Sequence, residues 1–119
     1  MVILIQPYGR IRWKLWQLSI SRLSEAVLLY RSVPVSVVGF GNVAFIGMGG
    51  EPFTQYTWNS HKVAAGKTVF CSCCTNGYEG YFPHARAFAE GGYEASSSPF
   101  TTALEQEYVD VLTNIFKKF

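Results

Sequence analysis

The chain is 119 residues long, 49% hydrophobic and only 15% charged, with a formal net charge of +2. This length supports one core, so we interpret residues 1–119 as a single domain, and the apolar composition argues against disorder. The small net charge and the lack of a long basic stripe argue against nucleic-acid binding. Four basic residues near the N-terminus are interpreted as the solvated edge of a strand: Arg10, Arg12, Lys14 and Arg22.

The first thirty residues are expected to contain a strand and a short helix. Charged and apolar residues alternate strictly from Arg10 to Leu15, which is the period of a half-buried strand. Ser24 and Glu25 are suited to open a helix that continues to Tyr30.

The clearest supersecondary unit is a β-hairpin. The runs Val33–Val38 and Val43–Met48 are rich in β-branched residues, and the four residues 39–42 between them include two glycines. A short glycine-containing connection between two such runs predicts an antiparallel pair.

No segment of the sequence indicates secretion or a membrane span. The run Met1–Ile5 is too short for the core of a signal peptide and has no basic region before it. The longest uncharged run, residues 32–50, is interrupted by turn residues and is assigned to the hairpin. The default expectation is therefore a cytoplasmic protein.

A helix and a further strand are predicted in the middle of the chain. Pro52 suits the first turn of a helix, so we expect a helix over Phe53–Ala65 that ends near Gly66. The run Lys67–Cys74 is too apolar for a surface position, which predicts a strand in the interior of a sheet.

The three cysteines lie within four residues, at Cys71, Cys73 and Cys74. Their odd number and crowding do not resemble a disulfide framework, which favours a reducing compartment. On a strand, Cys71 and Cys73 would face one way and Cys74 the other, a poor arrangement for zinc. We interpret them as small apolar strand residues.

The C-terminal segment has a helical apolar stripe. The residues that repeat at spacings of three and four are Leu104, Tyr108, Val111, Leu112, Ile115, Phe116 and Phe119. This period predicts a packed terminal helix after a loop at residues 96–99, with Thr102 and Glu105 spaced as a capping box. The fold class expected for the whole chain is α/β, a mixed sheet of short strands with a hairpin and a packed C-terminal helix.

Oxygen donors follow the apolar runs at two places. Glu51 comes directly after Gly49-Gly50, where a sharp turn would let its carboxylate project from the end of a strand. The same position also suits a carboxylate that stabilises the N-terminus of the next helix. Tyr78 and Tyr81 lie in a glycine-broken loop, where aromatic residues more often pack than bind ligands.

Three segments resemble the closing third of the catalytic domain of the neutral/alkaline ceramidase family. They are residues 35–54, which include Gly-Glu-Pro-Phe-Thr, the stretch Thr-Asn-Gly-Tyr-Glu-Gly-Tyr at 75–81, and Tyr-Glu-Ala-Ser-Ser at 93–97. The resemblance covers residues 33–119 and leaves residues 1–32 unassigned. It implies part of the catalytic domain of a zinc amidase that splits the amide of ceramide with a metal-activated water.

By this resemblance Glu51 and Tyr81 match metal ligands, and Tyr93 matches a catalytic tyrosine near the scissile amide. The chain departs from the family because the His-x-His stretch that supplies imidazole ligands is missing. His61 and His84 are interpreted as solvated loop or helix residues. The zinc site would then need an upstream segment or another chain to supply histidines.

The resemblance therefore implies a piece of a zinc-dependent amidohydrolase that acts on an N-acyl lipid amide and is inactive alone, with weak or absent zinc binding. The alternative is a non-catalytic remnant or interaction module that associates, with itself or a partner, through an exposed apolar sheet. A third interpretation is a lipid-surface binder that uses Trp13 and Trp16 with the basic residues nearby.

Overall fold

A four-stranded mixed sheet is the centre of the computed structural model, which describes residues 3–5, 11–15 and 29–118. The strand order is β1-β4-β5-β7, with bounds Ile3–Ile5, Val35–Phe40, Val43–Met48 and Thr68–Ser72. β1, β4 and β5 pair antiparallel, whereas β5 and β7 pair parallel. With the helices packed on it, this sheet confirms the predicted α/β class.

The predicted hairpin is formed by β4 and β5. Their register runs from Val35 opposite Met48 to Phe40 opposite Val43. The connection is only the turn Gly41-Asn42, two residues shorter than predicted, because β4 continues through Gly39 and Phe40. Gly41 has a φ of +55°, a left-handed conformation that glycine adopts without a Cβ penalty.

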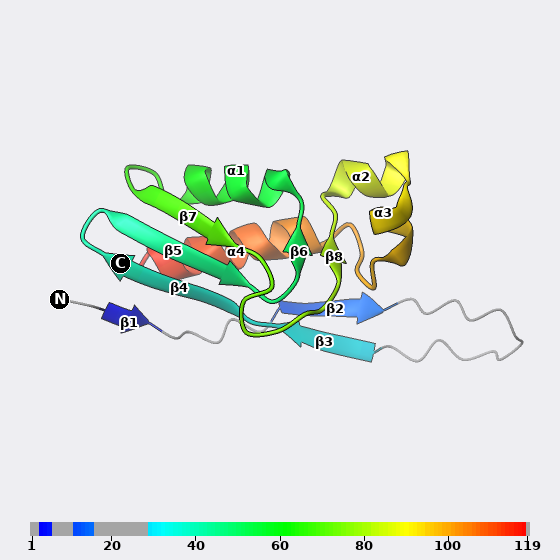
Figure 1. Ribbon diagram of the computed structural model, residues 1–119, viewed down its shortest axis with the longest axis horizontal. Helices are drawn as coiled ribbons and strands as arrows, with labels where there is room; N and C mark the ends of the chain where they lie inside the picture. Colours follow the sequence, from blue (N-terminus) through cyan, green and yellow to red (C-terminus); the bar gives the residue numbers. More distant parts are fainter. Residues whose placement is uncertain (1–2, 6–10, 16–28, 119) are drawn as a thin grey trace, which may run out of the picture.

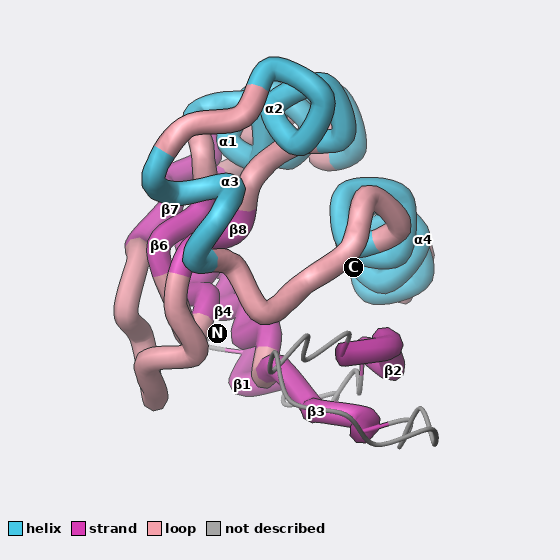
Figure 2. Tube along the Cα trace, turned by 90° about the vertical axis from the view of Figure 1, so that its right-hand side faces the viewer, coloured by secondary structure: helices cyan, strands magenta, loops and turns pink. Residues whose placement is uncertain are grey.

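Two helices cover one face of the sheet, α1 (Thr54–Val63) and α4 (Leu104–Phe116), as Figures 1 and 2 show. Both were predicted, and the stripe of α4 is buried at Leu104, Tyr108, Leu112 and Ile115. These side chains belong to one core together with residues of the sheet and α1: Val35, Val37, Ala44, Ile46, Met48, Tyr56 and Val69.

A buried polar contact joins the two helices. The Ser60 hydroxyl donates to the carbonyl oxygen of Tyr56 at 2.7 Å, and it lies 2.6 Å from the hydroxyl of Tyr108. The hydroxyl of Tyr56 donates to the carbonyl oxygen of Pro83 at 3.1 Å. Buried hydroxyls with partners avoid the cost of losing water, so this contact fixes how α1 lies against α4.

The prediction that Lys67–Cys74 lies inside the sheet is wrong. β7 is the last strand in the sheet order, and within it only Val69 is buried. Phe70 is 52% exposed and stacks on Phe45 at a ring-centroid distance of 5.1 Å, on the face opposite the helices. The apolar run therefore reflects an apolar open face rather than burial on both sides of the sheet.

A second antiparallel strand pair corrects the last residues of the predicted N-terminal helix. β2 (Ile11–Leu15) confirms the predicted strand and pairs antiparallel with β3 (Leu29–Val33). Tyr30, expected at the end of the helix, lies opposite Lys14 in this ladder, so strand pairing overrides the helical spacing there. The remainder of the expected helix, residues 24–28, lies outside the described residues.

The predicted capping box of α4 does not form. The helix begins after Ala103 without a side-chain cap. The carboxylate of Glu105 instead accepts hydrogen bonds from the Asn59 amide at 3.0 Å and the Ala85 N–H at 2.9 Å. Tertiary donors have replaced the local one, and Glu105 thereby links α4 to α1 and α2.

The remaining elements are short: β6 (Glu51–Pro52), β8 (Tyr81–Phe82), α2 (Ala85–Glu90) and α3 (Tyr93–Ser97). α3 takes Ser96 and Ser97 from the predicted loop into a helical turn. Within the described ranges, none of the helices is long and apolar enough to cross a membrane.

Candidate functional site

Glu51 and Tyr81 lie opposite each other in a two-stranded parallel ladder. β6 pairs with β8 in the register Glu51 to Tyr81 and Pro52 to Phe82. The Glu51 N–H donates to the carbonyl oxygen of Gly80 at 2.9 Å. Because side chains of residues in register project to the same side of a ladder, the carboxylate and the phenol share one face.

The loop before Tyr81 is fastened to the end of β5 by three backbone hydrogen bonds. The N–H groups of Cys74, Thr75 and Glu79 donate to the carbonyl oxygens of Gly50, Met48 and Gly49, at 2.8, 2.8 and 2.7 Å. Left-handed backbone at Cys74 (φ +50°), Asn76 (φ +60°) and Gly80 (φ +87°) gives the loop its turns. The loop is therefore fixed to the residues that lead into β6, and its own end leads into β8, so it positions both strands of the ladder.

Gly50 sets how closely this loop approaches Glu51. A Cβ atom at Gly50 would lie 2.5 Å from Cζ of Phe82 and 2.6 Å from the carbonyl oxygen of Gly80. Both distances are shorter than van der Waals contact, and the second involves backbone. The glycine before the carboxylate is thus required by close packing against β8.

The carboxylate of Glu51 perturbs two neighbouring phenols. Its hydrogen bond to Tyr78, together with partial loss of solvent and the negative charge of Glu51, raises the pKa of Tyr78 to about 12. The charge of Glu51 is also the main reason that the pKa of Tyr81 is raised, followed by loss of solvent and by Tyr93 and Glu94. Both phenols therefore remain protonated hydrogen-bond donors at neutral pH.

Tyr93 completes the group from a different element. It is the first residue of α3, and its ring stands edge-on to that of Tyr81, with ring centroids 6.0 Å apart. Its side chain is 72% exposed. The three residues singled out by resemblance, Glu51, Tyr81 and Tyr93, are thus neighbours in space.

Tyr78 was not assigned a role from the sequence, yet it is the phenol that hydrogen bonds to Glu51. The spacing of Tyr78 and Tyr81 was visible, but it did not indicate which of them would reach the carboxylate. Left-handed residues between β7 and Tyr78 redirect the loop, and their effect on side-chain direction is hard to read from residue types.

The donor set fits part of a zinc centre and does not make a complete one. A carboxylate and a phenol are oxygen ligands that can coordinate a divalent cation. However, zinc centres use three or four protein donors. Among the described residues no three His, Cys, Asp or Glu side chains converge. Any zinc held here would need further donors beyond Glu51 and Tyr81.

Neither histidine belongs to this group of residues. His61 is exposed on α1. His84 precedes α2, where its Nδ1 atom accepts a hydrogen bond from the Ala87 N–H at 3.2 Å. Capping a helix accounts for His84 without any ligand.

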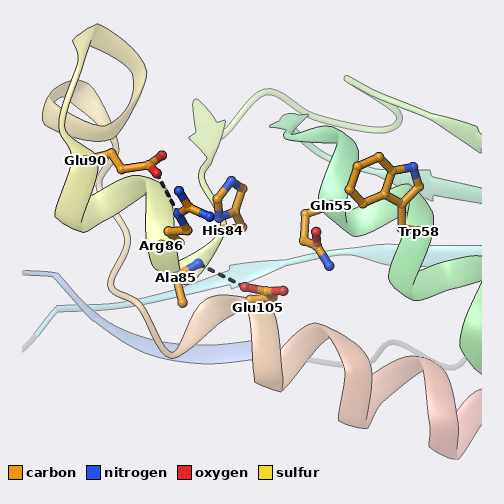
Figure 3. A pocket seen from close by; sticks show the side chains of 7 residues that line it. All are labelled: Gln55, Trp58, His84, Ala85, Arg86, Glu90 and Glu105. Carbon is orange, nitrogen blue, oxygen red and sulfur yellow. Dashed lines mark hydrogen bonds and ion pairs between the residues drawn. The ribbon is translucent and has the colours of Figure 1, made fainter.

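A hollow of about 560 Å³ lies between α1, α2 and α4, apart from Glu51 and Tyr81 (Figure 3). Its lining residues are Gln55, Trp58, His84, Ala85, Arg86, Glu90 and Glu105. The polar groups here largely satisfy one another, since Arg86 pairs with Glu90 at 2.6 Å and Glu105 accepts from the Ala85 N–H. We interpret this hollow as the junction of three helices.

No protein-family model and no curated protein matches the chain. Among solved structures, it is similar to a neutral ceramidase from Pseudomonas aeruginosa, with a TM-score of 0.52 and 16% sequence identity. The match covers 72% of this chain and 15% of the ceramidase. At this identity the similarity concerns the fold: the chain is folded like a small part of a neutral ceramidase.

Proposed function

We propose that this chain supplies the glutamate and tyrosine side of a ceramidase-like zinc centre that hydrolyses an N-acyl lipid amide. Glu51 and Tyr81 are the ligands in this proposal, and Tyr93 is the catalytic tyrosine. The observation that carries it is the register of β6 and β8, which sets Glu51 directly opposite Tyr81. The similar fold of part of a neutral ceramidase supports the assignment.

The remaining ligands come, in this proposal, from another segment or chain that carries histidines. Zinc needs imidazole donors here because one carboxylate and one neutral phenol bind it weakly. When bound, zinc supplies the Lewis acidity that activates water and polarises an amide carbonyl. The isolated chain is expected to be inactive.

The protein side chains have separable tasks in this arrangement. Glu51 contributes the negative charge that favours a cation, and Tyr78 holds that carboxylate by its hydrogen bond. Tyr93 is 72% exposed beside Tyr81, so its hydroxyl is free to donate to the carbonyl oxygen of an incoming amide.

Reconstitution tests this proposal. The chain is mixed with a separately expressed ceramidase-type segment that carries a His-x-His stretch, and zinc content and hydrolysis of a fluorescent N-acyl sphingosine are measured. Activity and stoichiometric zinc are expected only in the mixture, and both should be lost in Glu51→Gln. Glu90→Gln, a carboxylate on α2, is the matched control that retains both. Tight stoichiometric zinc on the isolated chain would contradict the incomplete site.

A second candidate function is a non-catalytic module that associates through the open face of its sheet. Large apolar side chains are exposed on this face, with exposed fractions of 38% at Val38, 61% at Phe40, 51% at Phe45 and 52% at Phe70. β7 also presents an unpaired strand edge within the described sheet. Such a surface favours pairing with a second copy of the chain.

Analytical ultracentrifugation separates the two candidates. The module predicts concentration-dependent self-association that Phe45→Ser with Phe70→Ser abolishes, whereas Trp58→Ser, an equally exposed aromatic on α1, leaves it intact. A monomer at all concentrations would rule out self-association through this face.

A further inference from the structure

A small cavity lies between the end of β7 and the helices, apart from the carboxylate of Glu51. Its volume is about 140 Å³, and its lining residues are Met48, Pro52, Tyr56, Thr57, Cys71, Ser72, Cys73 and Tyr108. Three of these carry sulfur: Met48, Cys71 and Cys73. No part of the proposed amide chemistry uses them.

The position of the two thiols follows from the strand. Val69 faces the core and Phe70 faces the open side, so Cys71, two residues after Val69, lies on the helix side, where it shares the cavity with Tyr108. Cys73 lies just past the end of β7 and reaches the same cavity. Both cysteines are free and exposed, so an ion can reach them from solvent.

The third sulfur lies deeper. Met48 is 3% exposed at the end of β5, and its backbone is fixed by the hydrogen bond from the Thr75 N–H at 2.8 Å. The hydroxyl of Thr75 donates weakly to the carbonyl oxygen of Cys73 at 3.3 Å. The loop that carries Cys73 is thereby held against the strand that carries Met48.

We propose that Cys71, Cys73 and Met48 form a binding site for Cu(I). Thiolate and thioether sulfur are soft ligands that select monovalent copper, whereas zinc would require three or four strong donors and gains little from a thioether. Binding releases the two thiol protons to solvent, so the ion is held by two thiolates and one neutral sulfur.

Cys74 does not belong to the ligand set. It has left-handed backbone with φ +50°, and its N–H donates to the carbonyl oxygen of Gly50, on the side of Glu51. Its thiol hydrogen bonds to that of Cys73, so it contacts one proposed ligand without lining the cavity. This makes Cys74 a matched control.

The test is a competition titration of the full chain, kept reduced and anaerobic, with Cu(I) supplied as its bicinchoninate complex. One equivalent of Cu(I) is expected to transfer to the protein. Cys71→Ser and Cys73→Ser should each weaken binding more than about a hundredfold, because loss of a direct ligand exceeds the roughly 10–100-fold effect of losing an outer partner. Cys74→Ser keeps a hydroxyl in place of the thiol that hydrogen bonds to Cys73, so it should weaken binding less than about tenfold.

Met48→Leu keeps side-chain volume and removes only the thioether, so it should weaken Cu(I) binding without changing the circular dichroism spectrum. Absence of Cu(I) transfer to the wild-type chain would overturn the proposal. A loss in Cys74→Ser equal to that in Cys73→Ser, with Cys71→Ser unaffected, would also overturn it, because the adjacent pair would then be the site. Unchanged Cu(I) binding in Met48→Leu would overturn the assignment of Met48 as a ligand and with it the three-sulfur site.

Discussion

The phenol of Tyr78 hydrogen bonds to the carboxylate of Glu51, and this contact together with partial loss of solvent raises the pKa of Tyr78 to about 12. Replacing Glu51 with glutamine removes the negative charge that opposes ionisation of the phenol. We expect the pKa of Tyr78 in Glu51→Gln to fall toward the ordinary tyrosine value of about 10. NMR titration of ring-labelled tyrosine measures it, with Tyr78→Phe to assign the resonance.

The control for this titration is Glu90→Gln, which removes a carboxylate that pairs with Arg86 on α2. It should leave the pKa of Tyr78 unchanged. If Tyr78 titrated at the same pH in Glu51→Gln and in the wild-type chain, the negative charge of Glu51 would not be a cause of the shift.

Alanine at Gly50 is expected to disrupt the ladder between β6 and β8. The new Cβ would lie 2.6 Å from the carbonyl oxygen of Gly80. This oxygen cannot move away without breaking the hydrogen bond that it accepts from the Glu51 N–H. Overpacking of this kind costs about 1–3 kcal/mol, which urea unfolding would measure.

The neighbouring Gly49→Ala is the matched control for Gly50→Ala. Its Cβ would lie 3.4 Å from atoms of the Pro34 ring, a much milder contact. We therefore expect a clearly smaller loss of stability. Equal losses in the two variants would show that close packing against Phe82 and Gly80 is not what requires Gly50.

Ser60 and Tyr108 form the buried contact between α1 and α4. Removing the hydroxyl of Ser60 should destabilise the protein more than removing the hydroxyl of Tyr108. The single hydroxyl proton of Ser60 goes to the carbonyl oxygen of Tyr56, so Tyr108 donates to Ser60. Ser60→Ala strands a fully buried phenol and should cost about 1–3 kcal/mol. Tyr108→Phe leaves Ser60 bonded and should cost about 0.5–1.5 kcal/mol.

Urea unfolding of these two variants and of the double variant gives the coupling between the hydroxyls. Because the second change in the double variant has no partner left to strand, the combined loss should be less than the sum of the single losses. An equal or larger loss in Tyr108→Phe would reverse the assigned direction of donation.

The parts of the fold that follow from local pattern could be read from the sequence. The hairpin of β4 and β5 follows from its β-branched runs and glycine turn, and α4 follows from its helical stripe. Helix α1 was expected because Pro52 suits a first turn, but Pro52 lies in β6 and the helix begins at Thr54. The edge position of β7 could not be read, because an apolar strand looks the same whether its second face meets a layer or solvent. The hydrogen bonds that Glu105 accepts could not be predicted either, since their donors, Asn59 and Ala85, are distant in sequence.

For the site, the residues came from resemblance and their proximity from the structure. Glu51 and Tyr81 are thirty positions apart, and only the parallel pairing of two very short strands brings them together. Two-residue strands have no readable period. The metal and catalytic roles of Glu51, Tyr81 and Tyr93 stay predictions.

Stability at alkaline pH should depend on two buried phenols. Burial raises the pKa of Tyr56 and of Tyr108, and the charge of Glu105 adds to the effect on Tyr56. In the unfolded chain both phenols ionise near pH 10, while in the folded chain they stay protonated. Above about pH 10 the folded state therefore binds more protons than the unfolded state, and the free energy of unfolding falls as pH rises.

Each of the two phenols should contribute a slope of up to about 1.4 kcal/mol per pH unit above pH 10, and nothing well below it. Urea unfolding at a series of alkaline pH values would measure this slope for the wild-type chain and for Tyr56→Phe with Tyr108→Phe. The double variant should be less stable at neutral pH, because it lacks the hydrogen bonds to Pro83 and Ser60. Its stability should nevertheless fall less steeply with pH. Parallel curves for the two proteins would mean that both phenols ionise as readily in the folded chain as in the unfolded one.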